Sequence, residues 1–233
     1  MQFYIGTSGW YYEWNTDKTL DWYINHSNLN SIELNASFYR FPFANQIKSW
    51  ARKGIKLRWS IKVNKLITHR YKFNEKAANI WKKFKDLFTP MRKLIDFYLF
   101  QIPPNFTDIE KVIQFSEMTG LKKKFALEIR NKNLLENPEL CKKLQKNFVL
   151  VSVDSPDFKN KIFEDKIVYM RLHGRTKWYQ HNYSDEELKE IATEITDLKP
   201  KKIYIYFNNN HNMLENAKTM FMLFTKLNNG ENK

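Results

Sequence analysis

The sequence predicts an α/β protein with the (β/α)8 architecture of a TIM-type barrel, as a single domain over residues 1–233 and with a reduced sixth helix. Three observations lead to this fold class: eight short apolar runs, amphipathic helical patterns between them, and no Gly-x-Gly-x-x-Gly pattern after the first run. An open, doubly wound sheet for dinucleotides would carry those glycines in its first turn, where this chain has TSGW.

The eight strand-like runs are rich in β-branched and aromatic residues and end in polar ones. They cover residues 2–6, 31–35, 57–63, 95–101, 125–130, 148–154, 167–173 and 202–208. Alternation of such runs with helices is typical of a parallel sheet, and eight units favour closure into a barrel.

The helical patterns carry apolar residues at three- and four-residue spacing. They cover residues 19–27, 44–53, 74–88, 109–117, 136–146, 185–196 and 214–226. Asn74, Asp108 and Ser184 stand where N-caps are expected. Residues 155–166 are few and charged, so we expect the sixth helix to be missing or reduced.

Composition limits the classes of partner. The chain has 39 Lys and Arg against 25 Asp and Glu, a net charge of +14, which favours anionic partners such as nucleic acid. Lysines on solvated outer helices are the ordinary alternative explanation. The single Cys141 excludes an intrachain disulfide and a cysteine-based zinc site. The first residues form only a strand-length apolar run, so we expect a cytoplasmic protein that does not contact the membrane.

Polar side chains gather where the predicted strands end, the face on which barrels of this kind bind ligands. Some lie two residues apart on one strand face, as Glu33 and Asn35 do. A buried structural ion pair, Glu33–Lys62 or Glu128–Arg171, is the alternative for any single pair. Polar residues at all eight strands favour a site instead. The candidates are Ser8, Trp10, Glu33, Asn35, Arg40, Lys62, His69, Gln101, Glu128, Arg130, Asp154, Arg171, His173, Arg175, Asn208 and Asn209.

The chain resembles the YecE-like family, domain of unknown function 72. The matching segments, in order, are IGTSGW (5–10), ELNASFYRFP (33–42) with Trp50, SIKVNKLITH (60–69), QIPPNF (101–106), ALEIR (126–130), VDSP (153–156), YMRLHGR (169–175) and YFNN (206–209) with Asn216 and Ala217. The resemblance implies a TIM-type barrel, distantly similar to endonuclease IV and sugar-isomerase barrels. It implies no established reaction.

Two positions depart from the pattern of the family. Arg130 is followed by Asn131, where the family often has His, and Asn210 replaces the usual acid near the last strand. Both changes reduce the capacity of this face to bind a metal.

The charges of the candidates indicate an anionic ligand. Arg40, Lys62, Arg130, Arg171 and Arg175 are five cations, against the three acids Glu33, Glu128 and Asp154. Arginine suits bidentate recognition of phosphate. We therefore expect a phosphate-bearing ligand, DNA or RNA in particular.

Several chemistries remain open for this face. A nuclease or phosphoesterase would use Glu33, Glu128, Asp154 and His173 as catalytic residues, either with a divalent metal or with His173 or a glutamate as base. A sugar or sugar-phosphate hydrolase or isomerase would use Glu33 and Glu128 as a carboxylate pair. A non-catalytic nucleic-acid binder would stack bases on Trp178, Tyr179 and Tyr183 beside Lys177.

Overall fold

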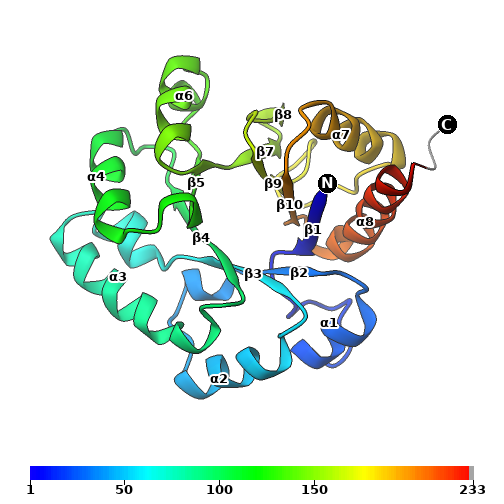
Figure 1. Ribbon diagram of the computed structural model, residues 1–233, viewed down its shortest axis with the longest axis horizontal. Helices are drawn as coiled ribbons and strands as arrows, with labels where there is room; N and C mark the ends of the chain where they lie inside the picture. The colour runs from blue at the N-terminus through cyan, green and yellow to red at the C-terminus, as the bar shows by residue number, and fades with distance from the viewer. Residues whose placement is uncertain (231–233) are drawn as a thin grey trace. The chain divides into compact units, whose positions relative to one another are not determined.

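The computed structural model describes residues 1–230, which form two compact units (Figure 1). Unit 1 comprises Met1–Glu33 and Val151–Lys233, and unit 2 comprises Leu34–Leu150. Each unit is built from parallel strands and the helices that connect them.

The strands of unit 1 lie in the order β2, β1, β10, β9, β7, β8. Neighbouring strands run parallel, except that β8 is antiparallel to β7. Parallel neighbours need long crossovers, which the helices of this unit supply. The strands are β1 (Gln2–Thr7), β2 (Ser31–Leu34), β7 (Ser152–Ser155), β8 (Phe158–Lys161), β9 (Ile167–Leu172) and β10 (Lys202–Phe207).

Three α-helices belong to unit 1: α1 (Leu20–His26), α7 (Asp185–Asp197) and α8 (Met213–Asn229), the last preceded by the short η5 (Asn210–Asn212). Helix α8 packs against β1, β10 and α7, and Figure 1 shows α7 and α8 side by side. Ile5, Met170 and Ile205 are fully buried in the core of this unit.

The strands of unit 2 lie in the order β6, β5, β4, β3, all parallel. They are β3 (Arg58–Lys62), β4 (Ile95–Ile102), β5 (Phe125–Ile129) and β6 (Val149–Leu150). The helices are α2 (Ala44–Lys53), α3 (Glu75–Leu87), α4 (Ile109–Thr119), α5 (Lys132–Leu135) and α6 (Pro138–Asn147), with the shorter turns η1 (Ala36–Phe38), η2 (Leu66–Arg70), η3 (Thr89–Met91) and η4 (Lys122–Lys124).

Aromatic packing holds the core of unit 2 together. The rings of Phe100 and Phe125 stack on the neighbouring strands β4 and β5, with centroids 3.9 Å apart and an interplanar angle of 5°. Both side chains are fully buried, as is Trp59 on β3. Burial of rings of this size is a large part of the hydrophobic stabilisation of a sheet.

The predicted α/β class with parallel strands is confirmed, but the count of eight strands is wrong, because residues 1–230 form ten. The expected strand at 148–154 is divided, so that β6 pairs with β5 while β7 pairs with β9. No helix forms over residues 155–166, where β8 pairs back onto β7, which agrees with the expected loss of the sixth helix. Closure of the strands into a barrel and the single domain stay predictions.

The three predicted N-caps, Asn74, Asp108 and Ser184, each cap a helix in the structure. Asn74 accepts a hydrogen bond from the backbone N–H of Ala77, and Asp108 accepts one from that of Lys111. The helix expected over 136–146 begins instead at Pro138, because proline fits the first turn and Asn137 caps it. Within residues 1–230, no helix combines the length and the apolar character that crossing a membrane requires.

Candidate functional site

The candidate residues of unit 1 lie at the carboxyl ends of neighbouring strands. Glu33 lies on β2, Ser8 directly follows β1, and Arg171 lies on β9. Asp154 lies on β7, and the pair Asn208 and Asn209 follows β10. The parallel pairing of β1, β10, β9 and β7 brings these ends to one edge of the sheet of unit 1.

Glu33 is the centre of a fully buried hydrogen-bonded cluster. Its Oε1 accepts from Arg171 Nη2 at 2.7 Å and from Ser8 Oγ at 2.8 Å, and its Oε2 accepts from the hydroxyl of Tyr169 at 2.7 Å. The side chains of Glu33 and Arg171 are both 0% exposed. The pair of Glu33 and Arg171 is neutral as a whole, and three hydrogen-bond donors fix the position of the carboxylate.

Asp154 is the centre of a second cluster. Its Oδ2 accepts from the Tyr183 hydroxyl at 2.6 Å, its Oδ1 accepts from the backbone N–H of Asn160 at 2.9 Å, and Arg175 Nε lies 3.3 Å from both oxygens. Arg175 also reaches Glu190 at 2.8 Å and donates to Asn160 Oδ1 at 2.7 Å. Carboxylates therefore surround this arginine.

The electrostatics of the Asp154 cluster follow from these contacts. Burial, and then the charge of Asp154, raise the pKa of the Tyr183 hydroxyl, which therefore stays a hydrogen-bond donor. The hydrogen bond from Arg175 lowers the pKa of Glu190. The carboxylates of Asp154, Glu187 and Glu190 all lie within 3.4 Å of Arg175, so this region has no excess positive charge.

The loop after β9 is tied to the residues that follow β10. Asn208 Nδ2 lies 3.2 Å from His173 Nδ1, and this ring is fully buried beside Trp178 at 5.3 Å. Asn209 Nδ2 donates to the carbonyl of His181 at 2.8 Å and to Asn216 Oδ1 at 2.7 Å. These bonds fix both asparagines and the loop.

Unit 2 holds a different, cationic set of candidates, called the Lys62 cluster below: Lys62, Lys65, His69, Glu128 and Arg130. Lys62 Nζ lies 4.4 Å from the centroid of the Phe38 ring, which also meets the His69 ring edge-on at 5.0 Å. Arg130 Nε donates to Glu128 Oε1 at 2.8 Å. Lys62 is 5% exposed, whereas Lys65 is exposed and Arg130 is half-buried.

The pKa of His69 reflects both its burial and the positive charge of the Lys62 cluster. Burial lowers its pKa, and the charges of Lys62, Arg130 and Lys65 lower it further, to about 4. The ring is therefore neutral near pH 7, with Nδ1 hydrogen-bonded to Thr68 Oγ1 at 2.8 Å. The charges of Lys62, Lys65 and Arg130 therefore all oppose protonation of the His69 ring.

The other predicted residues are less closely tied to these clusters. Gln101 on β4 is in register with Glu128 on β5 and is half-buried. Asn35 follows β2, and its buried Oδ1 has no hydrogen-bond partner among the described residues. Arg40 is exposed after η1, and the backbone carbonyl of Trp10 accepts a hydrogen bond from Asn15 Nδ2 at 2.8 Å.

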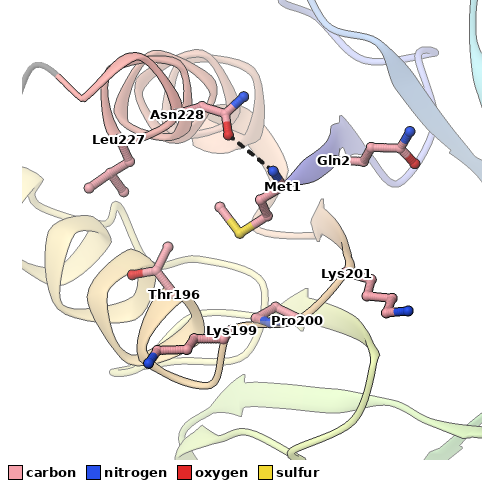
Figure 2. A pocket seen from close by; sticks show the side chains of 8 residues that line it. All are labelled: Met1, Gln2, Thr196, Lys199, Pro200, Lys201, Leu227 and Asn228. Atoms are coloured by element: carbon pink, nitrogen blue, oxygen red, sulfur yellow. Dashed lines mark hydrogen bonds between the residues drawn. The ribbon is translucent and has the colours of Figure 1, made fainter.

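A pocket of about 590 Å³ lies at the opposite ends of the unit 1 strands. Figure 2 shows Gln2 at the start of β1 and Lys201 just before β10, with the Met1 amino group donating to Asn228 Oδ1 at 3.4 Å. Ligands of related α/β architectures bind at the carboxyl ends instead. We therefore do not assign the functional site to this pocket.

Sequence reasoning missed Tyr169 and Lys65, and it considered Tyr183 only as a surface for stacking bases, whereas the ring is buried and its hydroxyl donates to Asp154. Tyr169 lies two residues before Arg171 and so shares its strand face, a spacing that could have revealed it. Lys65 directly precedes the short η2 and Tyr183 lies in a loop, so no periodicity indicates which way either side chain points. Among residues 1–230, no three His, Cys, Asp or Glu side chains are grouped so that they could hold a metal ion.

Comparison with known proteins agrees with the observed fold. The chain is similar to a DUF72 family protein (EF0366) of Enterococcus faecalis V583, with a TM-score of 0.78, 20% identity and 96% of each chain covered. It is also similar to a DUF72 family protein (TM1631) of Thermotoga maritima MSB8, with a TM-score of 0.76 and 22% identity over 97% of this chain and 100% of that one.

A more distant likeness extends to sugar epimerases. A D-psicose 3-epimerase in the presence of D-fructose gives a TM-score of 0.55 at 10% identity, over 97% of this chain and 99% of that one. At such identities the likeness shows the fold alone. No curated protein matches the chain. The model of "Protein of unknown function DUF72" matches residues 4–233, so the resemblance seen in the sequence is confirmed and the chain belongs to the DUF72 family.

Proposed function

We propose that the protein binds a phosphate-bearing ligand at the Lys62 cluster of unit 2. The supporting observation is that, after burial, the charges of Lys62, Arg130 and Lys65 all lower the pKa of His69, which places three cations around one ring. Neighbouring positive charges repel one another. They also oppose the binding of a proton to the His69 ring. A phosphate relieves that repulsion and accepts hydrogen bonds from all three cations.

Arg171 and Arg175, two of the five cations expected from the sequence to bind phosphate, suit this role less well. Arg171 is fully buried against Glu33, and Arg175 is bonded to Asp154 and Glu190. A phosphate at either arginine would have to displace a carboxylate. Arg130 is likewise paired with Glu128, so the comparison favours the Lys62 cluster through its exposed Lys65, which lies beside the ring of Tyr39.

Nucleic acid is the leading source of the phosphate. The net charge of +14 attracts polyanions. Lys65 Nζ also lies 5.8 Å from the centroid of the Tyr39 ring, which is 65% exposed. An exposed aromatic ring beside a cation is the arrangement on which single-stranded bases stack.

Binding is better supported than hydrolysis. Glu33 and Asp154 already accept hydrogen bonds on both oxygens, and Glu128 is paired with Arg130. A carboxylate so engaged is a weak general base, because its proton-accepting lone pairs are occupied. A nuclease or phosphoesterase reaction through these acids and His173 stays a prediction.

A sugar phosphate is the second candidate ligand, because the chain shares its fold with the D-tagatose 3-epimerase-like protein (TM-score 0.55, 13% identity over 99% of both chains) and with the D-psicose 3-epimerase. The same cations would hold its phosphate. Binding of a sugar phosphate would not require a base to stack on the ring of Tyr39.

The two candidates separate in a binding titration. Fluorescence anisotropy should show single-stranded DNA or RNA binding whose affinity falls steeply with salt. Lys65→Met and Lys62→Met should each weaken binding about tenfold and reduce the salt slope by about one. Lys82→Met, the same change on the exposed face of α3, is the control and should keep wild-type affinity.

Each other outcome has a definite meaning. Thermal stabilisation by fructose 6-phosphate without nucleic-acid binding would favour the sugar phosphate, provided that Lys65→Met abolishes it. Equal losses in Lys65→Met and Lys82→Met would show that general surface charge, and not the Lys62 cluster, holds the anion.

A further inference from the structure

The loop over residues 8–19 and the segment over residues 208–212 are neighbours in unit 1. They follow β1 and β10, which pair in parallel up to Thr7 and Phe207, and Ser8 continues the pairing by donating to the Phe207 carbonyl at 2.8 Å. Farther out, Glu13 of the loop lies 3.7 Å from His211 of the segment. The two stretches therefore meet at the carboxyl edge of the sheet.

Three buried polar atoms in these two stretches have no hydrogen-bond partner among the described residues: Trp14 Nε1, Asn15 Oδ1 and Asn209 Oδ1. Asn15 and Asn209 are both 0% exposed. Buried polar groups are nearly always hydrogen-bonded, so a concentration of exceptions at one edge requires an explanation.

The hydrogen bonds donated by the two amide nitrogens fix the orientation of both side-chain amides. Asn15 Nδ2 donates to the carbonyls of Trp10 and Thr19, each at 2.8 Å. Asn209 Nδ2 likewise donates to the carbonyl of His181 and to Asn216 Oδ1. Exchanging oxygen and nitrogen would break two bonds in each case, so both unpartnered atoms are acceptors.

The two acceptor oxygens and the one N–H donor determine which chemical groups of a ligand could bond to all three atoms. A phosphate or carboxylate offers acceptors only and would meet two carbonyl oxygens. An ammonium group offers donors only and cannot accept from the indole of Trp14. A hydroxyl group both donates and accepts, so a molecule with several hydroxyls satisfies all three atoms.

Aromatic rings around the loop suit the apolar face of such a molecule. Tyr12 and Trp14 stack with centroids 5.7 Å apart, Trp10 is half-buried, and Tyr11 is 74% exposed. We propose that residues 8–19 and 208–212 form a binding site for a neutral polyhydroxylated molecule, a monosaccharide or cyclitol. This site does not depend on the phosphate ligand proposed for unit 2.

All three atoms are buried, so the proposed ligand reaches them when the loop over residues 8–19 moves outward. Gly9, with φ of +109°, allows a backbone conformation there that other residues rarely adopt. Water bound to the same three atoms is the competing explanation, and the experiment separates the two.

The test is a ¹H–¹⁵N NMR titration that follows the indole N–H of Trp14. D-ribose, D-mannose, myo-inositol and inorganic phosphate are the separate probes. We expect at least one of the three polyols to shift the Trp14 signal saturably, and phosphate not to shift it. No saturable shift with any polyol up to its solubility limit, or a shift with phosphate alone, would overturn the proposal in favour of bound water or an anion.

Trp14→Phe gives the matched variant, because it keeps an aromatic ring and removes only the donor. It should weaken binding of the active polyol about five- to tenfold, measured by calorimetry, as expected for the loss of one neutral hydrogen bond. Trp22→Phe makes the same change on α1, 6.1 Å from the Trp14 ring, and should retain wild-type affinity. Equal affinities of the Trp14→Phe and wild-type proteins would contradict the assignment of the donor.

Discussion

Single residues in this protein differ sharply in how far their charge is neutralised. Glu33 receives three side-chain donors in a dry interior, whereas Glu215 meets Lys218 at the surface, where it is 73% exposed. Water screens the surface pair and leaves it with little net energy. The buried pair depends on both partners, because removing one leaves a charge that water cannot solvate.

Arg171→Met should therefore lower the free energy of unfolding by about 3–5 kcal/mol, because it leaves Glu33 buried without its cation. Urea denaturation measures this change. Lys218→Met, which breaks the exposed pair, should change stability by less than about 0.5 kcal/mol. Similar effects of the two variants would show that Glu33 is not the buried centre of its cluster.

His69 should give the protein a pH-dependent stability. Its folded-state pKa of about 4 lies below the ordinary value of 6.5, so the folded state favours the neutral ring. The contribution is full above pH 6.5 and is lost as the pH falls from 6.5 towards 4, where the unfolded chain binds the proton first. His69→Asn should reduce the fall in Tm over this interval. An unchanged fall would place the titrating group elsewhere.

The residue types at the strand ends were predictable, but their partners were not. Glu33 and Arg171 are both in the expected polar set, yet their contact depends on how β9 and β2 are placed around β1 and β10. The N-caps Asn74 and Ser184 were predictable because a cap bonds to a residue three positions away. Long-range partners have no comparable pattern in the sequence.

At the scale of elements, the loop over residues 173–183 is held at its base by several bonds. The Gly174 N–H donates to the Tyr183 hydroxyl, and the Tyr179 N–H donates to the carbonyl of His173 at 2.7 Å. Gly174 has φ of +101°, and a Cβ atom there would lie 2.6 Å from the Cβ of His181. Both the positive φ of residue 174 and the lack of room for a Cβ atom require glycine at this position.

Gly174→Ala should lower the free energy of unfolding by more than about 2 kcal/mol, since backbone strain and a clash add together. Gly120→Ala, at the end of α4, is the control. It also has positive φ, but nothing lies within 4 Å of the added Cβ, so its cost should be about 1 kcal/mol. Chemical denaturation compares the two variants, and equal costs would show that the 173–183 loop is not tightly closed.

The division of the strand expected at 148–154 was not predictable at this scale. The run FVLVSVD is continuously apolar up to Ser152, and nothing in it indicates a break at Val151. Only the pairing shows the division, because β6 joins β5 while β7 joins β9. A choice of partner strand is a tertiary property that a short apolar run does not encode.

At the scale of the whole molecule, the chain contains two compact units, and the chain of unit 1 is interrupted by unit 2. The sequence predicts one domain, which requires the two units to unfold together. Differential scanning calorimetry should then show one transition, with equal calorimetric and van't Hoff enthalpies. Two separate transitions would make the units independent domains.

The two units also differ in the charge of their candidate residues. Arg171 and Arg175 of unit 1 face carboxylates, whereas in unit 2, where Arg130 is paired with Glu128, the charges of Lys62, Lys65 and Arg130 all lower the pKa of His69. The proposed phosphate site depends on that difference. The sequence placed Lys62 and Arg130 among the expected phosphate ligands together with Arg40, Arg171 and Arg175, but it did not distinguish between these cations.

NMR titration of the His69 ring, with and without inorganic phosphate, tests the phosphate site most directly. Without phosphate the midpoint should lie near pH 4, because burial and three cations oppose protonation. Saturating phosphate should raise the midpoint in the wild-type and Lys82→Met proteins and raise it less in Lys65→Met. A midpoint near 6.5 that phosphate leaves unchanged would contradict the cationic cluster and the function proposed from it.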